Sequence, residues 1–545
     1  MSRLLDRHTR FMLKQPFVIP FALRRFYSRG PTLEGAIEEL RVELRTREER
    51  FERLLAAAVF GEVENPYRRL FDHAGCRPGD VHELLDRLGL DETLGELARR
   101  GVYLMPGEVQ GTDDVVRGSL RFRIEPDSLL ASHYYRRRWP ATFLGQTSGS
   151  TGVPTRSPTS LAWQERETPA FAAFIMAHGL QAHRLAAYEP MLAGVSAGIQ
   201  SVNIMVRLGI PLCRWFAREV PVSGLLEAAY FRLTAHQIAW AGRTYGPGYA
   251  SPEPIRDRDI GKITSWVEHE RSTGALTCIR AVASSCARIA RSALESGTSL
   301  EGCTFLASGE PVTTAKRRLI ERSGASLTVL WGYEPGPVYV GLGCARPEHG
   351  DEMHVLTHSL ALVPHPEPQG GPVAESTMQP LLFTALYPSA ARVQINVSNG
   401  DFAMLSQRDC GCALHEAGLH LHVHGVGSYD KLTSQGLAYS REHLFELFET
   451  HLPDAFGGSP GDYQLIEEED DSGRTFLTLC VAPEVGPVDE EALLNFLASE
   501  LGRGSRSNRF ASGLWKKEGT FRIRRTSPIS SSRGKVLPLR VGPRR

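Results

Sequence analysis

The sequence lacks any hydrophobic run long enough to cross a lipid bilayer. Its apolar stretch Phe17–Leu23 contains Pro20 and is far shorter than the ~20 residues that a spanning helix needs. The small-residue cleavage pattern that ends a secretory signal peptide is also lacking. These absences predict a cytoplasmic protein without a transmembrane segment.

Net charge and a regular cysteine framework are lacking as well. Lys and Arg together number 62, and so do Asp and Glu, so no bulk field draws the chain to nucleic acid or to a membrane. The nine cysteines are an odd number and lie far apart, which argues against the disulfides of a secreted protein. We therefore expect no nucleic-acid partner.

Local charge is less even, because the first 30 residues are strongly basic. They contain one acid, Asp6, against Arg3, Arg7, Arg10, Lys14, Arg24, Arg25 and Arg29. Such a segment is either a solvated N-terminal helix or an arm that lies on a membrane surface. After it, Leu33, Ile37, Leu40 and Leu44 recur at helical spacing and predict one helix over residues 32–60. Residues 1–60 are assigned to a basic, helical extension.

The remainder of the 545 residues divides into two predicted units. Apolar runs such as Leu327–Trp331 and Leu381–Tyr387 alternate with helical stretches such as Thr313–Arg322, which is typical of an α/β region. Beyond residue 430 the pattern becomes helix, hairpin, helix. Its predicted elements are a helix capped by Ser440, strands Tyr463–Ile466 and Phe476–Val481, and a helix over Asp489–Leu501. We predict a large mixed α/β domain over 61–429 and a small α+β domain over 430–545.

Glycine and hydroxyl residues are concentrated in one run. It reads Thr147-Ser148-Gly149-Ser150-Thr151-Gly152-Val153-Pro154-Thr155. Two glycines let the backbone approach a polyanion, and hydroxyl and amide donors can converge on phosphate oxygens. No Gly-Lys-Ser/Thr ends the run, which disfavours a P-loop kinase or NTPase. The alternative is a polar surface linker.

This run resembles the phosphate loop of the acyl-adenylate-forming superfamily, which includes acyl-CoA synthetases and peptide-synthetase adenylation domains. Lysine often ends that loop, whereas Thr155 ends it here, as in the phenylacetate–CoA ligase branch. The resemblance extends from about Asn65 to Lys535. It implies ATP as a substrate and a large mixed α/β N-terminal domain followed by a small mobile α+β domain.

Three further segments follow in the family's order. Ser308-Gly309-Glu310-Pro311 resembles the segment that borders adenine. Trp331-Gly332-Tyr333-Glu334 resembles the aromatic–glycine–acid segment, although the turn before the acid is one residue short. This implies Tyr333 or Trp331 beside adenine and Glu334 as a ligand of Mg²⁺. Gly400-Asp401 follows the apolar Val393–Val397, so we expect Asp401 just past a strand, where a carboxylate can hold the ribose hydroxyls.

Two segments near the end complete the series. Ser428-Tyr429-Asp430-Lys431-Leu432 resembles the hinge between the two domains of the family, with Asp430 and Lys431 at its centre. Pro528-Ile529-Ser530-Ser531-Ser532-Arg533-Gly534-Lys535 resembles the terminal segment whose lysine serves adenylation, which implies that role for Lys535. The arginine that precedes the hinge in the family is replaced by Gly427 or Ser428.

Cysteine and histidine residues suggest a metal site. Cys344, His354, Cys410 and Cys412 supply the four thiolate and imidazole ligands of a structural zinc site, with His349 as a competitor for the second place. Some phenylacetate–CoA ligase-like proteins have a similar Cys-x-Cys pair. Reduced cysteines in a turn are the alternative. His420, His422 and His424 alternate, so on a strand they would share one face, which we expect to be exposed.

The resemblance implies a two-step reaction. A substrate carboxylate attacks the α-phosphate of ATP, pyrophosphate leaves, and the acyl group passes to a thiol, most often coenzyme A. A carrier-protein thiol, a protein cysteine and an amine remain alternative acceptors. A non-catalytic nucleotide-binding homologue is the second alternative.

Overall fold

The computed structural model describes most of the chain. The described residues are 7–62, 64–129, 142–146, 156–190, 197–218, 225–256, 259–309, 312, 314–332, 339–366, 379–387, 392–428, 432–434, 437–439, 444, 446–458, 461–470, 474–503, 519–529 and 539–541. None of the helices within these ranges is long and apolar enough to cross a membrane.

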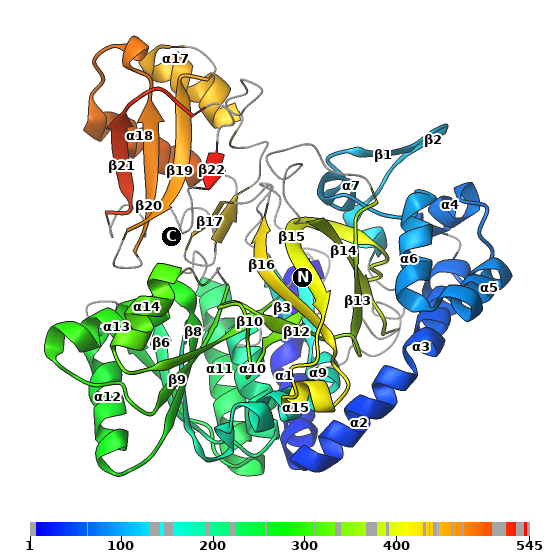
Figure 1. Ribbon diagram of the computed structural model, residues 1–545, viewed down its shortest axis with the longest axis horizontal. Coiled ribbons are helices and arrows are strands. Elements are labelled where there is room, and N and C mark those ends of the chain that lie inside the picture. The colour runs from blue at the N-terminus through cyan, green and yellow to red at the C-terminus, as the bar shows by residue number, and fades with distance from the viewer. Residues whose placement is uncertain are drawn as a thin grey trace.

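A twelve-stranded sheet lies at the centre of the molecule (Figure 1). Its strand order is β13-β14-β15-β16-β12-β11-β10-β9-β8-β5-β6-β7. The half from β10 to β7 is parallel, and the other half is antiparallel. The strands are β5 (Arg184–Pro190), β6 (Leu212–Arg218), β7 (Pro252–Ile255), β8 (Thr277–Val282), β9 (Cys303–Ser308), β10 (Ser326–Trp331), β11 (Gly341–Gly343), β12 (Met353–Val355), β13 (Leu360–Pro364), β14 (Gln379–Ala385), β15 (Val397–Gln407) and β16 (Leu421–Ser428).

Helices cover both faces of the parallel half (Figure 1). On β5, Leu185 and Ala187 belong to one hydrophobic cluster, whereas Ala186 belongs to another. Alternate side chains are thus buried on opposite faces, as in parallel sheets generally. One face packs against α1 (Arg7–Ser28), α9 (Leu161–Ala177), α10 (Ala197–Arg207) and α11 (Leu225–Tyr245), and the other against α12 (Gly261–Ser272), α13 (Ala283–Ser296) and α14 (Thr314–Arg322).

A third hydrophobic cluster joins the N-terminal helices to the antiparallel half. Leu94 and Leu97 pack there with Ala361 of β13 and Leu382 of β14. The helices of this region are α4 (Pro66–His73), α5 (Pro78–Leu88), α6 (Leu90–Arg99) and α7 (Pro106–Gln110), followed by the hairpin β1 (Asp114–Arg117) and β2 (Leu120–Arg123).

The single helix predicted over residues 32–60 is wrong in its continuity. The segment forms α2 (Leu33–Arg45), α3 (Arg47–Leu54) and a π-helical turn, η1 (Leu55–Phe60). The break falls at Thr46, whose φ is −107° and whose hydroxyl donates to the Val42 carbonyl at 3.2 Å. A threonine that bonds its own preceding turn competes with the helical ladder, and the helix ends there.

The C-terminal part has its own sheet and its own hydrophobic cluster. Its strand order is β21-β20-β19-β22, and Leu465, Leu479 and Leu497 lie in its core. The elements are a π-helical turn, η5 (Leu447–His451), α17 (Leu452–Phe456), β19 (Tyr463–Glu469), β20 (Thr475–Val481), α18 (Glu490–Leu501), β21 (Phe521–Arg525) and β22 (Leu539–Val541). The prediction of a large mixed α/β part followed by a smaller α+β part is confirmed.

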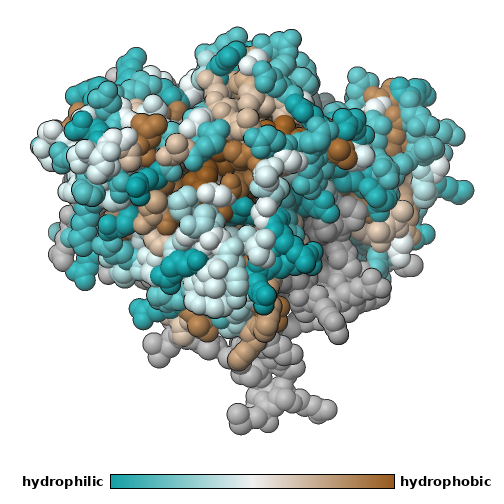
Figure 2. Space-filling model, turned by 90° about the horizontal axis from the view of Figure 1, so that it is seen from below, coloured by the Kyte–Doolittle hydropathy of each residue, from teal (hydrophilic) through white to brown (hydrophobic). Residues whose placement is uncertain are grey.

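The surface seen from below is mostly hydrophilic, with hydrophobic residues gathered near its centre (Figure 2).

Candidate functional site

The parallel strands β9 and β10 bring two of the predicted segments together. Val329 of β10 lies beside Ala307 of β9 in a parallel register. Ser308-Gly309 and Trp331-Gly332 therefore leave the sheet side by side at its carboxyl edge, where open α/β sheets bind ligands. Gly309 has a φ of +80°, which glycine adopts without steric cost.

Trp331 itself is directed into the protein. Its side chain is buried and packs edge-to-face on Phe383, with ring centroids 5.7 Å apart. The Trp331 ring is therefore part of the hydrophobic core of the antiparallel half. Of the two aromatic candidates for the adenine contact, this leaves Tyr333 as the better one.

A buried arginine holds the end of β9. Arg280 of β8 is 1% exposed and donates to the Ser308 hydroxyl. It also lies 3.4 Å from the Glu189 carboxylate and donates to the Ser201 hydroxyl at 3.1 Å. Burial opposes its charge, but Tyr339 and Glu189 raise the pKa of Arg280 above its ordinary value.

No local pattern in the sequence indicated this arginine, because Glu189 and Arg280 meet only when β5 and β8 pair. Arg280 would position the segment predicted to border adenine.

The predicted phosphate loop is bracketed by a hairpin. β3 (Thr142–Gln146) and β4 (Arg156–Ser160) are antiparallel, and Gln146 pairs with Arg156. The two ends of the segment 147–155 are thus held together by backbone pairing.

A buried glutamate fixes the far end of the segment that contains Glu334. Glu167 of α9 accepts from the Tyr339 backbone amide at 3.0 Å and from the Trp163 indole at 2.9 Å. The Val340 amide donates to the Trp331 carbonyl at 2.7 Å. The residues on either side of 333–338, at the end of β10 and just before β11, are therefore held in place.

Many of the predicted site residues lie outside the described ranges. They are Thr147, Ser148, Gly149, Ser150, Thr151, Gly152, Thr155, Glu310, Pro311, Tyr333, Glu334, Asp430, Lys431 and Lys535. Ser440, predicted as a helix cap, also lies outside them. Their roles stay predictions.

The position of Asp401 differs from the expectation. Asp401 lies within β15, which begins at Val397 and runs to Gln407, rather than just past a strand. Gly400 has a φ of +82° and a bulge follows at Phe402, so the strand continues through the predicted turn. The Asn399 amide donates to one oxygen of Asp401 at 2.6 Å. In the sheet, β11, β12 and β16 lie between β15 and β10.

The four predicted metal ligands lie together. The side-chain ligand atoms of Cys344, His354, Cys410 and Cys412 are all within 4.8 Å of one another, and all four residues are buried. The His354 Nε2 atom is 3.2 Å from the Cys412 sulfur and 3.5 Å from the Cys410 sulfur. With Zn–S bonds of about 2.3 Å and Zn–N bonds of about 2.0 Å, such separations fit ligands of one tetrahedral ion.

The surroundings of this cluster suit thiolate ligands. The Arg346 amide donates to the Cys344 sulfur at 3.3 Å, and Arg408 donates to it at 3.5 Å. The hydrogen bond between Cys344 and Cys412 lowers the pKa of Cys412 and raises that of Cys344, and burial raises the pKa of Cys410. The Leu419 carbonyl, 2.7 Å from the His354 Nδ1 atom, fixes the ring so that Nε2 faces the sulfurs.

The expectation of an exposed histidine face is wrong for His422. His422 is fully buried, and its ring lies against His354 with centroids 4.0 Å apart. Its Nδ1 atom is 2.6 Å from the Glu352 carboxylate. His424 is partly buried and stacks on His349 at 3.8 Å, so His349 does not join the cysteines. His422 and His424 share a face of β16 that packs against β12 and the loop before it, whereas His420 precedes the strand and is exposed, as expected.

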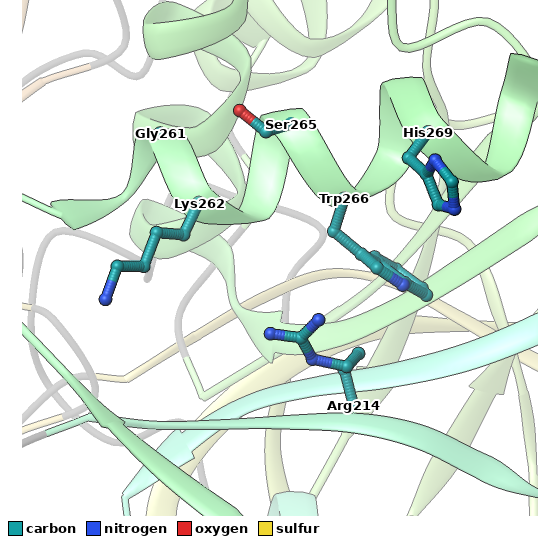
Figure 3. Close-up of a pocket in the computed structure, with 6 residues that line it drawn as sticks. All are labelled: Arg214, Gly261, Lys262, Ser265, Trp266 and His269. Carbon is teal, nitrogen blue, oxygen red and sulfur yellow. The ribbon is translucent and has the colours of Figure 1, made fainter.

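A surface hollow of about 550 Å³ lies elsewhere (Figure 3). Lys262 and Trp266 of α12 and Arg214 of β6 line it, with Gly261, Ser265 and His269. Arg214 lies near the amino end of β6, whereas the predicted nucleotide-binding segments follow the carboxyl ends of strands. The hollow is therefore not the site that the sequence predicts.

Comparison with known proteins gives a weak structural likeness. No protein-family model and no curated protein matches the chain. A 2-hydroxyisobutyryl-CoA ligase in complex with an acyl-AMP is 13% identical, with 95% of this chain and 92% of that chain covered and a TM-score of 0.42. The amide bond synthetase McbA from Marinactinospora thermotolerans is 11% identical, with 91% and 93% covered and a TM-score of 0.40.

An o-succinylbenzoate CoA synthetase from Bacillus subtilis is 13% identical, with 72% of this chain and 68% of that chain covered and a TM-score of 0.41. Sequence identities and TM-scores this low assign neither a family nor a function to this chain.

Proposed function

We propose that this chain activates a carboxylic acid with ATP to an acyl-adenylate and releases pyrophosphate. The observation that carries the proposal is the order of its segments along the chain: residues 147–155, 308–311, 331–334, 400–401 and 528–535 follow the order of the acyl-adenylate-forming superfamily. The parallel register that puts Ser308-Gly309 beside Trp331-Gly332 supports a shared nucleotide site at this edge.

The residues have distinct roles in this proposal. Donors within 147–155 bind the phosphates, and the carboxylate of Asp401 holds the ribose and so positions the α-phosphorus. Glu334 would hold Mg²⁺, which would neutralise phosphate charge when bound. The ammonium of Lys535 stabilises the charge that grows on the phosphoryl oxygens as the carboxylate attacks.

The anchors around the site support this assignment of roles. Arg280 fixes Ser308, and Glu167 fixes Tyr339 after the segment of Glu334. In the C-terminal part, the Gln464 side chain donates to the Ile529 carbonyl at 3.1 Å and accepts from the Ile529 amide at 2.9 Å. The strand of Gln464 thereby fixes the start of the segment that leads to Lys535.

The acceptor of the acyl group is proposed to be the thiol of coenzyme A, as in the phenylacetate–CoA ligase branch that Thr155 and the Cys-x-Cys pair resemble. The small C-terminal part would then turn about Asp430-Lys431 between the two steps. A cytoplasmic location is part of this proposal.

We also propose that Cys344, His354, Cys410 and Cys412 hold one structural Zn²⁺. Three sulfurs and one imidazole nitrogen are the ligands of a closed structural site. The cluster joins β11, β12 and the connection between β15 and β16, so the ion would fasten the middle of the antiparallel half.

The first test is acid-dependent exchange of pyrophosphate into ATP. Purified protein is assayed with a panel of aryl, short-chain and long-chain acids, and Lys535→Ala serves as the matched inactive variant. Exchange with one class of acid, lost in the variant, is the expected result. ATP binding without exchange for any acid would instead favour the non-catalytic homologue.

A second assay distinguishes the acceptors. The acid found above is supplied with ATP and with coenzyme A, with amines or with a carrier-protein thiol, and the acylated product is identified by mass spectrometry. We expect the coenzyme A thioester. Product from amines alone would establish an amide-forming ligase.

A further inference from the structure

Helix α1 presents two large rings to solvent. Ile19, Leu23 and Phe26 of this helix are buried completely against the protein. Phe17 and Phe21, one turn apart on another face, are each 77% exposed. Single exposed apolar residues are common on protein surfaces, but a group of them marks an interaction site.

The neighbouring helix α11 holds α1 in place. Pro20 has no N–H, so the carbonyl of Pro16 has no helical donor. The Gln237 side chain of α11 donates to that carbonyl at 2.7 Å. Near the C-terminal ends of both helices, the Arg24 guanidinium lies 5.6 Å from the centroid of the Tyr245 ring. The earlier residue of α1, Pro16, contacts the earlier residue of α11, Gln237, and the later Arg24 contacts the later Tyr245, so the two helices run parallel. These contacts hold α1 against α11 at the protein surface.

The exposed rings of α1 continue onto α11. Leu233 and Trp240, two helical turns apart on α11, are 47% and 46% exposed, and they bracket Gln237, the residue that contacts α1. With Phe17, Phe21 and the 41% exposed Val18, they form what we call the aromatic patch. These five are half of the ten large hydrophobic residues that are exposed in the described part of the chain.

The charges around the aromatic patch are positive. Arg24 and Arg25 are exposed on α1, and Arg232 and Arg243 on α11. The sequence of α1 contains no acid, and that of α11 contains one, Glu227. The chain as a whole has no net charge, so this pair of helices is a local basic surface.

We propose that the aromatic patch lies on the surface of an anionic lipid membrane. Phe and Trp rings enter the boundary between headgroups and acyl chains, and arginines beside them pair with lipid phosphates. Phe17, Phe21 and Arg24 recur at helical spacing along one stripe, so rings and cation would reach the same depth of a planar surface.

Vesicle binding tests the proposal on the full chain. Sedimentation is measured with vesicles of phosphatidylcholine alone and with vesicles that contain 30% phosphatidylserine, at low and at high salt. We expect binding to the anionic vesicles only, and weaker binding at high salt because ions screen the arginines.

Matched variants locate the contact. Phe17→Ser with Phe21→Ser should weaken partitioning by about tenfold or more, because apolar area no longer enters the bilayer. Leu276→Ser, at a residue 45% exposed outside the patch, should bind as the wild type does. Brominated lipids should quench Trp fluorescence in the wild type more than in Trp240→Phe. Melting temperatures of all variants check that they are folded.

Three results would overturn the proposal. The first is no sedimentation with either vesicle. The second is an equal loss of vesicle binding in Leu276→Ser and in the Phe17/Phe21 variant. The third is a dimer in solution that the Phe17/Phe21 variant dissociates while vesicle binding is unchanged, because the patch would then be covered by a second copy of the chain.

Discussion

Lys316 and Glu469 form a buried ion pair between the two parts of the chain, with 3.5 Å between the Nζ and Oε2 atoms. Lys316 lies in α14, which follows the segment 308–311, and Glu469 ends β19 of the C-terminal sheet. Their side chains are 4% and 9% exposed. The pair therefore links the C-terminal sheet to the predicted nucleotide site.

The first prediction concerns this pair. Lys316→Met should lower the free energy of unfolding by about 3 kcal/mol, because the Glu469 carboxylate stays buried after the opposite charge of Lys316 is removed. Replacing both residues by Met should restore most of that loss. Urea unfolding measures both, and Glu49→Gln, in an exposed pair with Arg53, should change stability by less than about 0.5 kcal/mol. Losses that simply add in the double variant would mean that the two residues are not coupled.

The second prediction concerns zinc. Purified protein should contain close to one zinc per chain, and Cys412→Ser should lower both the metal content and the melting temperature, because one ligand of four is lost. Cys213→Ser, outside the cluster, should keep the metal. Metal-free protein with unchanged melting temperature and activity would contradict the site.

The third prediction concerns Asp401. If its carboxylate accepts both ribose hydroxyls, Asp401→Ala should weaken the use of ATP by a few kcal/mol, since charge-assisted hydrogen bonds contribute roughly 1.5–3 kcal/mol each. A 2′,3′-dideoxy analogue of ATP should then impair the wild type much more than the variant. If the analogue impaired the wild type and Asp401→Ala equally, Asp401 would not be the residue that binds the ribose hydroxyls.

The fourth prediction concerns pH and His358. Burial, and then the charge of Arg50, lower the pKa of His358 to about 3. The unfolded chain binds a proton there below about pH 6.5, whereas the folded chain does not until about pH 3, so stability falls as the pH falls through this window. The slope is about 1.4 kcal/mol per pH unit. Urea unfolding of His358→Gln between pH 7.5 and 5 should show a flatter slope. The exposed His269→Gln should keep the slope of the wild type, and an unchanged slope in His358→Gln would contradict the prediction.

The fifth prediction concerns Lys535. Lys535→Ala should lose roughly 100- to 1000-fold in acid-dependent pyrophosphate exchange, as when one preorganised donor is removed from a transition state. It should keep much of the second step when supplied with synthetic acyl-adenylate. Lys535→Arg should rescue poorly, because a planar fork does not replace a compact charge. Arg533→Ala is the matched control, and near-normal exchange in Lys535→Ala would remove the adenylating role from this lysine.

The sequence by itself determined what depends on neighbours along the chain. Leu327–Trp331 and Thr313–Arg322 were predicted as strand and helix, and β10 and α14 confirm them within one residue. Asp489 was predicted at the start of a helix, and its side chain caps α18 by accepting from the Ala492 amide at 3.0 Å. Periodicity and capping act within a few residues, so one sequence suffices to recognise them.

Only the tertiary structure decided which distant residues meet. It selected His354 over His349 as the neighbour of the cysteines, because β12 pairs with β16 and turns His354 inward. It buried His422, although the alternation of histidines alone did not show whether that side chain would be buried or exposed. It also brought Arg280 of β8 to Glu189 of β5. It also put Phe17 and Trp240 on one surface, because α1 lies along α11. Strand pairing and helix packing bring together residues that are far apart in the chain, and no local pattern records which partners they will find.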